Sequence, residues 1–104
     1  MTASLVLAVD AGNSKTVALV ADAAGTILGA ERSGCGDIYA VGVEPAVAAV
    51  MDAIGGALRA ASARTDDVVA GGFCLAGVDW PEDQALWETH LGAALTQMRH
   101  CRVR

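Results

Sequence analysis

The sequence predicts an α/β fold in which three strands are followed by a helix, a fourth strand and a second helix. Two kinds of pattern carry this prediction. Short apolar runs at 5–9, 16–21 and 68–75 are typical of buried strands, and the apolar residues after residue 44 recur at helical spacing. The 104 residues suffice for one domain with one modest core, built from Ala, Val and Leu because aromatic residues make up only 4% of the chain.

The first three strands are expected at 5–9, 15–22 and 26–32. Six residues, 10–15, separate the first strand from the apolar run of the second, so the pattern predicts a hairpin with a wide loop. Residues 23–25, Ala-Ala-Gly, are predicted to form a tight turn between the second and third strands. Together these segments predict a three-stranded antiparallel meander.

A Gly-rich segment at 33–42 is expected to be irregular and to lead into a helix that begins near Glu44. Pro45 would lie in the first turn, where its missing N–H is tolerated. Gly55 and Gly56 would each weaken this helix by about 1 kcal/mol, which a close helix–sheet contact would explain. The predicted apolar face of the helix comprises Val47, Val50, Met51, Ile54, Leu58 and Ala61.

The fourth strand is expected at 68–75, parallel to the first, because the intervening helix provides the crossover. Pro81 is expected to open the second helix. The predicted core-facing residues of that helix are Leu86, Trp87, Leu91, Ala94, Leu95 and Met98. This topology brings Asp10 and Asp79 to the carboxyl ends of neighbouring strands, where open α/β sheets bind ligands.

The loop after the first strand carries residues suited to phosphate and metal binding. Gly12 lets a ligand approach the backbone closely, and successive N–H groups can form an anion-binding nest. Asp10, at the strand end, is suited to hold Mg²⁺ directly or through water. Lys15 offers a positive charge, and Ser14 and Thr16 offer hydroxyls. The spacing is not that of a Walker A loop, and from residue types alone a polar hairpin turn is the alternative.

Residues 10–16, Asp-Ala-Gly-Asn-Ser-Lys-Thr after an apolar strand, resemble the first phosphate motif of the actin/hexokinase/Hsp70 ATPase superfamily. Three further segments, at 24–28, 33–39 and 74–79, fit in order the family that contains N-acetylglucosamine kinases, glucosamine kinases and the BadF/BadG/BcrA/BcrD activator ATPases. The resemblance covers residues 4–95. It implies the ribonuclease-H-like lobe of the actin-like ATPase fold.

The resemblance implies ATP-dependent phosphorylation of an amino sugar, with ATP and Mg²⁺ as cofactors. This chain alone is expected to bind nucleotide weakly and to turn over little, because half of the closing cleft is missing. Asp10 would organise Mg²⁺, and Asp79 would be a substrate contact and the general base that takes the proton of a sugar hydroxyl. The residues that would cradle the phosphates are Gly12, Asn13, Ser14, Lys15 and Thr16. The alternative for Asp79 is a helix N-cap with Glu82 as the reciprocal capping residue, and the two roles can coexist.

The segment 36–39, Gly-Asp-Ile-Tyr, matches the place where the resembled kinases hold the sugar, usually with an Asn. Gly36 and Asp37 are therefore candidate substrate-binding residues. Asp37 accepts hydrogen bonds but cannot donate them, so it suits the ammonium group of glucosamine and weakens the case for N-acetylglucosamine. An Asx turn is the alternative for Asp37. Trp80 and Trp87 are expected to pack against the protein and not to bind ligand.

The resemblance stops with the first lobe. The second phosphate motif, the adenosine motif and most of the sugar site of the family do not occur in these 104 residues. Residues 1–98 are predicted to be an incomplete lobe. Residues 99–104, which hold three of the seven basic residues, are predicted to be a basic tail in place of an apolar fifth strand. A truncated or frame-shifted product and a short solvated terminus both account for this end.

Two other functions stay open. An activator ATPase of the 2-hydroxyacyl-CoA dehydratase or benzoyl-CoA reductase type would share the phosphate loop and use ATP hydrolysis to drive a redox partner. A non-catalytic remnant or partner-binding module would fit a lobe without its second half. An incomplete lobe exposes apolar surface, so we expect self-association or a second lobe supplied from elsewhere.

Composition narrows the partners and the compartment. A net charge of −5 without a broad basic patch argues against nucleic acid. No apolar run approaches the length of a membrane span, and the N-terminus lacks the basic region of a cleaved signal, so a cytoplasmic protein is expected. Cys35, Cys74 and Cys101 form no Cys-x-x-Cys pair, and His90 and His100 add no zinc spacing, so free thiols are expected.

Overall fold

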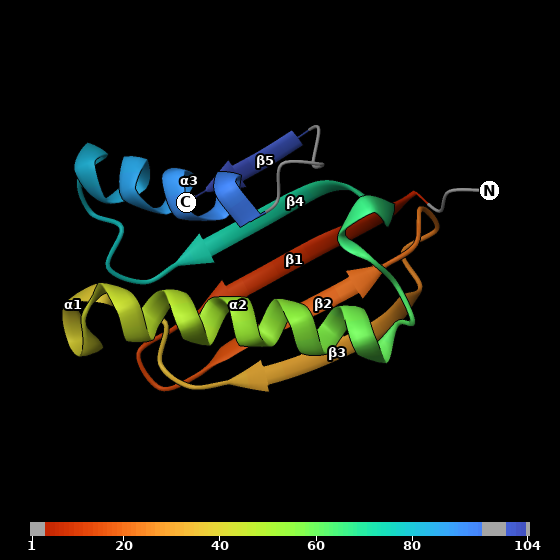
Figure 1. Ribbon diagram of the computed structural model, residues 1–104, viewed down its shortest axis with the longest axis horizontal. Helices are drawn as coiled ribbons and strands as arrows, with labels where there is room; N and C mark the ends of the chain where they lie inside the picture. Colours follow the sequence, from red (N-terminus) through yellow and green to blue (C-terminus); the bar gives the residue numbers. More distant parts are fainter. Residues whose placement is uncertain (1–3, 95–99, 104) are drawn as a thin grey trace.

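A five-stranded mixed sheet with its helices on one face forms the frame of the structure (Figure 1). The computed structural model describes residues 4–94 and 100–103. In chain order the elements are β1 (Leu5–Ala11), β2 (Thr16–Ala21), β3 (Ile27–Ser33), α1 (Ile38–Val41), α2 (Val43–Ala60), a 3₁₀ turn η1 (Thr65–Asp67), β4 (Val68–Leu75), α3 (Pro81–Ala94) and β5 (His100–Val103).

The strand order is β3-β2-β1-β4-β5. β1 pairs antiparallel with β2, and β2 with β3, whereas β4 lies parallel to both β1 and β5. This confirms the predicted antiparallel meander followed by helix, parallel strand and helix. The fourth strand has the predicted bounds.

The hairpin between β1 and β2 is tighter than predicted. β1 continues through Asp10 and Ala11, because these residues keep the antiparallel ladder with Val17 and Thr16. The N–H of Gly12 then donates to the carbonyl of Lys15 at 2.8 Å, which leaves only a short turn. The prediction of a wide loop from residue 10 to residue 15 is therefore wrong.

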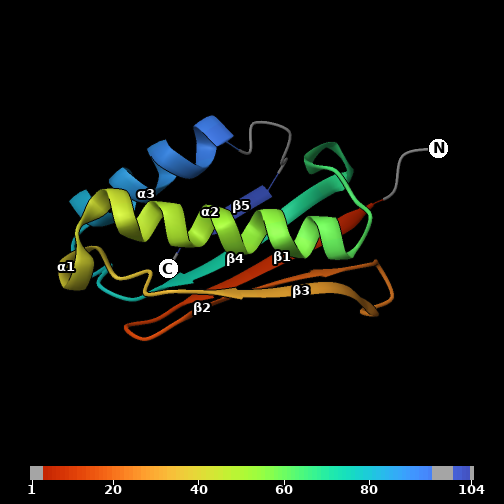
Figure 2. The ribbon, with the colours of Figure 1, turned by 60° about the horizontal axis from the view of Figure 1, so that its bottom comes forward.

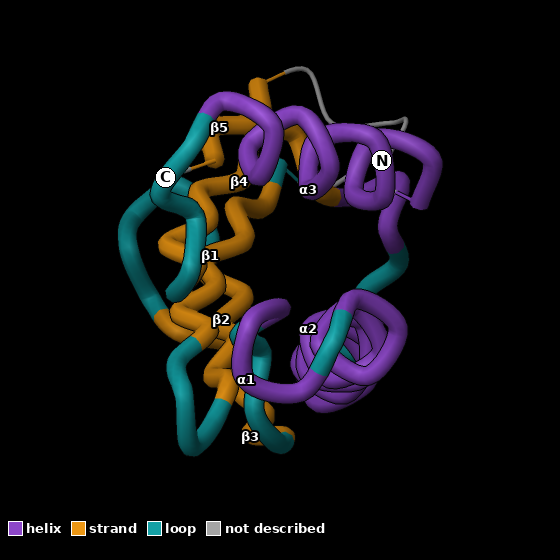
Figure 3. Tube along the Cα trace, turned by 90° about the vertical axis from the view of Figure 1, so that its left-hand side faces the viewer, coloured by secondary structure: helices purple, strands orange, loops and turns teal. Residues whose placement is uncertain are grey.

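The strands alternate between a face that the helices cover and a face that they leave open. In β1 the buried side chains are those of Leu5, Leu7, Val9 and Ala11, and the residues between them are exposed. Figures 2 and 3 show α2 and α3 on the same side of the sheet. Between the helices and the sheet lie the largest fully buried side chains, which include Trp87, Phe73, Ile54 and Leu91.

The long helix α2 approaches β3 so closely that glycine is required at the contact. A Cβ on Gly56 would overlap the side chain of Glu31, and a Cβ on Gly29 would lie 2.6 Å from the backbone nitrogen of Ala61. This confirms the expected reason for Gly56. The buried face therefore uses small residues and differs in part from the predicted one: it comprises Ala46, Ala49, Val50, Ala53, Ile54, Gly56, Ala57 and Leu58.

Three predicted members of the helix face are not fully buried. Val47 and Met51 are half-buried at the border of the core, and the half-buried Ala61 lies one residue beyond the end of α2. In α3, the predicted core residues Trp87 and Leu91 are fully buried. Leu95 and Met98 lie outside the described residues.

The basic end of the chain contributes a strand, which the sequence did not lead us to expect. His100–Val103 pairs with Ala70–Phe73 along the edge of β4. Backbone N–H and C=O groups make this pairing, so it does not need the apolar side chains that usually mark a parallel strand. The predicted boundary at residue 98 falls in the undescribed segment 95–99 and remains a prediction.

No helix in the described part of the chain is both long and apolar enough to cross a membrane.

Candidate functional site

Three loops meet at the carboxyl ends of β1 and β4, and we call them the three-loop site: residues 12–15, 34–37 and 76–80. The N–H of Gly36 donates to the carbonyl of Gly12 at 3.0 Å, and the N–H of Ala76 donates to the carbonyl of Ala11 at 2.8 Å. The fold thereby gathers the predicted phosphate, substrate and base residues at one end of the sheet, as expected for an open α/β sheet.

The first of these loops presents polar side chains to solvent. Asn13, Ser14 and Lys15 are exposed, and within the described residues their side chains make no hydrogen bond or ion pair. Gly12 does not have a positive φ, and a Cβ there would meet only the carbonyl oxygen of Lys15 at an ordinary 3.4 Å. No contact with a described residue therefore requires glycine at position 12, and only the Lys15 carbonyl oxygen lies within 4 Å of the place where a Cβ would stand.

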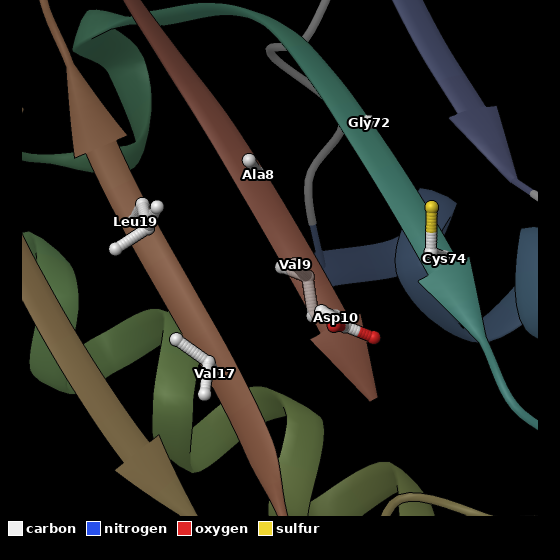
Figure 4. Close-up of a pocket in the computed structure, with 7 residues that line it drawn as sticks. All are labelled: Ala8, Val9, Asp10, Val17, Leu19, Gly72 and Cys74. Atoms are coloured by element: carbon white, nitrogen blue, oxygen red, sulfur yellow. The ribbon is translucent and has the colours of Figure 1, made fainter. Parts of the chain in front are cut away.

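Asp10 lies one residue before the end of β1, on the face that the helices leave open. Figure 4 shows its carboxylate on the side toward β4, where the neighbouring residue is Cys74. An open hollow of about 560 Å³ extends from this point along the sheet. Among the described residues the Asp10 carboxylate has no hydrogen-bond partner, so its oxygens are available to a cation.

Thr16 and Gly36, two predicted ligand-binding residues, also have structural roles. The Thr16 side chain is fully buried, and its hydroxyl donates to the carbonyl of Gly34 at 2.9 Å. A Cβ on Gly36 would come within 2.7 Å of both the Ala11 methyl group and the Thr16 hydroxyl oxygen. The Thr16 hydroxyl would have to give up the Gly34 bond to reach a phosphate.

Asp37 forms the predicted Asx turn. Its side chain is buried, and Oδ1 accepts a hydrogen bond from the N–H of Tyr39 at 2.9 Å, which caps the short helix α1. Gly77 lies directly against it with a φ of +79°, and a Cβ on Gly77 would overlap Oδ1 of Asp37. The second and third loops of the site are therefore in contact, and Oδ2 of Asp37 has no partner among the described residues.

Asp79 does not cap α3. Its side chain is exposed, and within residues 4–94 and 100–103 its carboxylate has no hydrogen-bond partner. The capping carboxylate belongs to Asp83, whose Oδ2 accepts the N–H groups of Asp79 and Trp80 at 3.2 and 3.1 Å. The predicted capping role of Glu82 is wrong, because the N-cap is Trp80 and the third helical residue is then Asp83.

Two aromatic residues border Asp79 and its loop. Tyr39 and Trp80 are 64% and 65% exposed, so the expectation that Trp80 packs inside the protein is wrong, whereas Trp87 is fully buried as expected. The Tyr39 hydroxyl donates to Oδ1 of Asp83 at 2.5 Å. Sequence reasoning missed this contact between residues 44 positions apart; the acidic residue at the third helical position was the only local signal.

The bond between Tyr39 and Asp83 shifts the titration of both groups. The hydrogen bond to the Asp83 carboxylate raises the pKa of the Tyr39 phenol, and partial burial and the negative charges of Asp83, Asp79 and Glu82 add to this effect. The same hydrogen bond lowers the pKa of Asp83, with help from the two backbone N–H groups. At neutral pH the Tyr39 phenol therefore keeps its proton, and the Asp83 carboxylate that accepts the hydrogen bond is charged.

Solved structures share this arrangement of strands and helices. A structure named "putative N-acetylglucosamine kinase" from Porphyromonas gingivalis superposes with a TM-score of 0.73 at 20% identity and covers 94% of this chain. A protein of the same name from Chromobacterium violaceum gives a TM-score of 0.67 at 19% identity over 97% of this chain. Component A of (R)-2-hydroxyglutaryl-CoA dehydratase from Acidaminococcus fermentans superposes with a TM-score of 0.61 at 11% identity and covers 96% of this chain.

The chain has the ribonuclease-H-like lobe of the actin-like ATPase fold. It spans about a third of the length of these structures, namely 33%, 34% and 30%. Neither a family model nor a curated protein matches the sequence. At these identities the likeness establishes the fold of the lobe, in which the three-loop site lies at the carboxyl ends of β1 and β4.

Proposed function

We propose that this chain is the phosphate-binding lobe of an ATP-dependent kinase that phosphorylates an amino sugar. The observation that carries the proposal is the three-loop site itself. There Asn13, Ser14 and Lys15 are exposed without internal partners, at the same end of the sheet as the partly free carboxylate of Asp37 and the free carboxylate of Asp79. Phosphoryl transfer is catalysed by positioning and charge stabilisation, which this set of residues can supply.

The residues around the first loop fit ATP and Mg²⁺. Lys15, the only lysine of the chain, is exposed and forms no ion pair within the described residues, so its charge is available to a phosphate oxygen. Gly12 leaves its backbone accessible, and Asp10 offers oxygens to a hard cation. Bound Mg²⁺ would neutralise phosphate charge at this end of the sheet.

The carboxylates of the other two loops fit an amino sugar. In the proposed complex Asp79 takes the proton of the attacking sugar hydroxyl, since its carboxylate is exposed and not used to cap α3. The buried Asp37 carboxylate contacts the sugar ammonium, because a buried charge is best stabilised by an opposite charge. This favours glucosamine over its N-acetylated form as the substrate.

The proposed phosphate loop is tested by Lys15→Ala. A lost charge-assisted hydrogen bond of about 1.5–3 kcal/mol corresponds to a roughly tenfold or greater loss of affinity. We therefore expect isothermal titration calorimetry to show MgATP binding that is at least about tenfold weaker in Lys15→Ala. The control is Arg59→Ala, which removes the same charge from an exposed position at the end of α2. Equal MgATP affinity in the two variants would contradict the proposal.

An activator ATPase is the second candidate, and the likeness to component A of (R)-2-hydroxyglutaryl-CoA dehydratase favours it. Such a protein uses the same loop for phosphate and needs no sugar site. Calorimetry with glucosamine separates the two candidates. MgATP binding that depends on Lys15, combined with no binding of glucosamine or N-acetylglucosamine, would favour the activator.

A further inference from the structure

Asp83 joins two segments of the site that are far apart in the sequence. It is a buried carboxylate with only 6% of its surface exposed, and both of its oxygens are in use. Oδ2 accepts the N–H groups of Asp79 and Trp80, and Oδ1 accepts the hydroxyl of Tyr39. Capping of α3 accounts for the bonds to Oδ2 only, so the bond between Oδ1 and the Tyr39 hydroxyl needs a separate explanation.

Tyr39 is held at both ends although most of its side chain is exposed. Its N–H donates to Asp37, and its hydroxyl donates to Asp83. Between these two points the ring passes over the third loop, since a Cβ on Gly77 would lie 3.1 Å from Cδ2 of Tyr39. An exposed tyrosine gains little from such confinement unless its position, or that of its neighbours, matters.

Three hydrogen bonds and the covalent frame of Tyr39 therefore connect the Asp37 carboxylate to the backbone of Asp79, the two residues that the proposed function assigns to the sugar. The connection leads from Asp37 to the N–H of Tyr39, from the Tyr39 hydroxyl to Asp83, and from Asp83 to the N–H of Asp79. We propose that Asp83 is a positioning residue, which fixes Asp79 relative to Asp37 by binding the Asp79 backbone with one oxygen and the Tyr39 hydroxyl with the other.

Asp83 does not itself face the ligand in this proposal, because both oxygens are occupied within the protein. Its role with sugar rests on the proposed function. The geometric part, that Asp83 holds Tyr39 beside Asp79, is tested without any ligand. Failure of one part can therefore be told from failure of the other.

The chain offers a direct probe, because Tyr39 is its only tyrosine. We expect alkaline titration, followed by phenolate absorbance, to give a pKa above 10.0 in the unaltered chain, since Asp83, Asp79 and Glu82 all oppose ionisation. Asp83→Asn should bring the pKa back toward 10.0 while its amide oxygen still accepts the N–H groups at the start of α3. Asp52→Asn, an exposed carboxylate-to-amide change on α2, is the control and should leave the titration unchanged.

A second variant, Asp79→Asn, tests whether the Tyr39 phenol lies near Asp79. Asp79→Asn should lower the pKa of Tyr39 in the unaltered background, because the Asp79 charge lies near the phenol. In the Asp83→Asn background the same change should have a smaller effect, because the Tyr39 hydroxyl has lost its bond to the Asp83 carboxylate. Tyr39→Phe gives the reciprocal result: carboxyl NMR should show the pKa of Asp83 rising toward its ordinary value. Far-UV circular dichroism at each pH checks that the variants are folded.

Sugar affinity completes the test. Asp83→Asn and Tyr39→Phe should each weaken glucosamine binding about tenfold, as expected for the loss of one hydrogen bond, and leave MgATP binding unchanged. A tyrosine that titrates at 10.0 in the unaltered chain, or an Asp79→Asn effect that is undiminished in Asp83→Asn, would overturn the proposal. Glucosamine binding that is intact in both variants would overturn it as well. If the unaltered chain binds no glucosamine, the proposed sugar fails, and the titrations alone decide the role of Asp83.

Discussion

At the scale of single residues, the unpartnered side chains carry the functional argument. Thr16 and Asp83 are buried and fully bonded, so their contribution is to hold loops in place. Lys15 and Asp79 are exposed and make no contact with other described residues that would explain their presence. Polar side chains that the fold does not use, placed where a sheet binds its ligands, are the residues whose replacement should change function and leave stability intact.

Asp79→Asn tests the proposed general base. Amide nitrogen and oxygen cannot take a proton from a sugar hydroxyl at neutral pH, so the phosphorylation rate should fall about 10²–10⁴-fold. The measurement is transfer of the γ-phosphate of ATP to glucosamine by a protein in which this lobe is joined to a second lobe, with Asp52→Asn as the control. A raised KM for glucosamine with an unchanged kcat would mean that Asp79 binds the sugar and that another group acts as the base.

At the scale of elements, local sequence patterns predicted the elements that depend mainly on neighbouring residues. The strand at Val68–Leu75 is a run of apolar and β-branched residues and has the predicted bounds. The short α1 was not predicted, because four residues carry no periodicity and Asp37 offered an Asx turn as well as a ligand contact. The β5 strand depends on the free edge of β4, a partner far away in the sequence, and its own basic residues gave no sign of it.

The residues of the three-loop site also divide into those that a local sequence pattern predicts and those that depend on distant residues. Asp10, Gly12 and Lys15 could be located from one contiguous motif, and the parallel pairing of β1 with β4 brought Asp79 to the same end as predicted. The Tyr39–Asp83 bond joins residues 44 positions apart, so no local pattern contains it. The burial of Thr16 follows from the extra strand residues that tightened the hairpin, which the apolar run alone did not reveal.

Gly29→Ala tests the close contact of α2 with β3. The new methyl group would lie 2.6 Å from the Ala61 nitrogen and overlap the Ala57 carbonyl oxygen, and backbone atoms cannot rotate away as a side chain can. Overpacking of this kind destabilises by about 1–3 kcal/mol. The measurement is the midpoint of urea unfolding. Gly72→Ala on β4 is the matched control, since a Cβ there meets nothing within 4 Å, and it should unfold at or above the unaltered midpoint.

At the scale of the whole molecule, the described helices cover one side of the sheet and leave the other side open. Its β1, β4 and β5 strands are parallel, and parallel sheets normally have both faces covered. The open face instead presents Val6, which is 39% exposed, and the half-buried Val17 and Leu19. In the 104-residue chain, another copy is the available apolar partner.

The chain should therefore self-associate through this open face. Size-exclusion chromatography with light scattering should show a mass that rises with concentration above that of a 10.5 kDa monomer. Leu19→Lys places a charge at the centre of the face and should restore the monomer, because an unpaired charge is costly to desolvate. Val41→Lys is the control, since Val41 is also exposed but lies on α1, away from the open face. A monomeric unaltered chain at high concentration, or association that Leu19→Lys leaves intact, would show that the open face tolerates water without a partner.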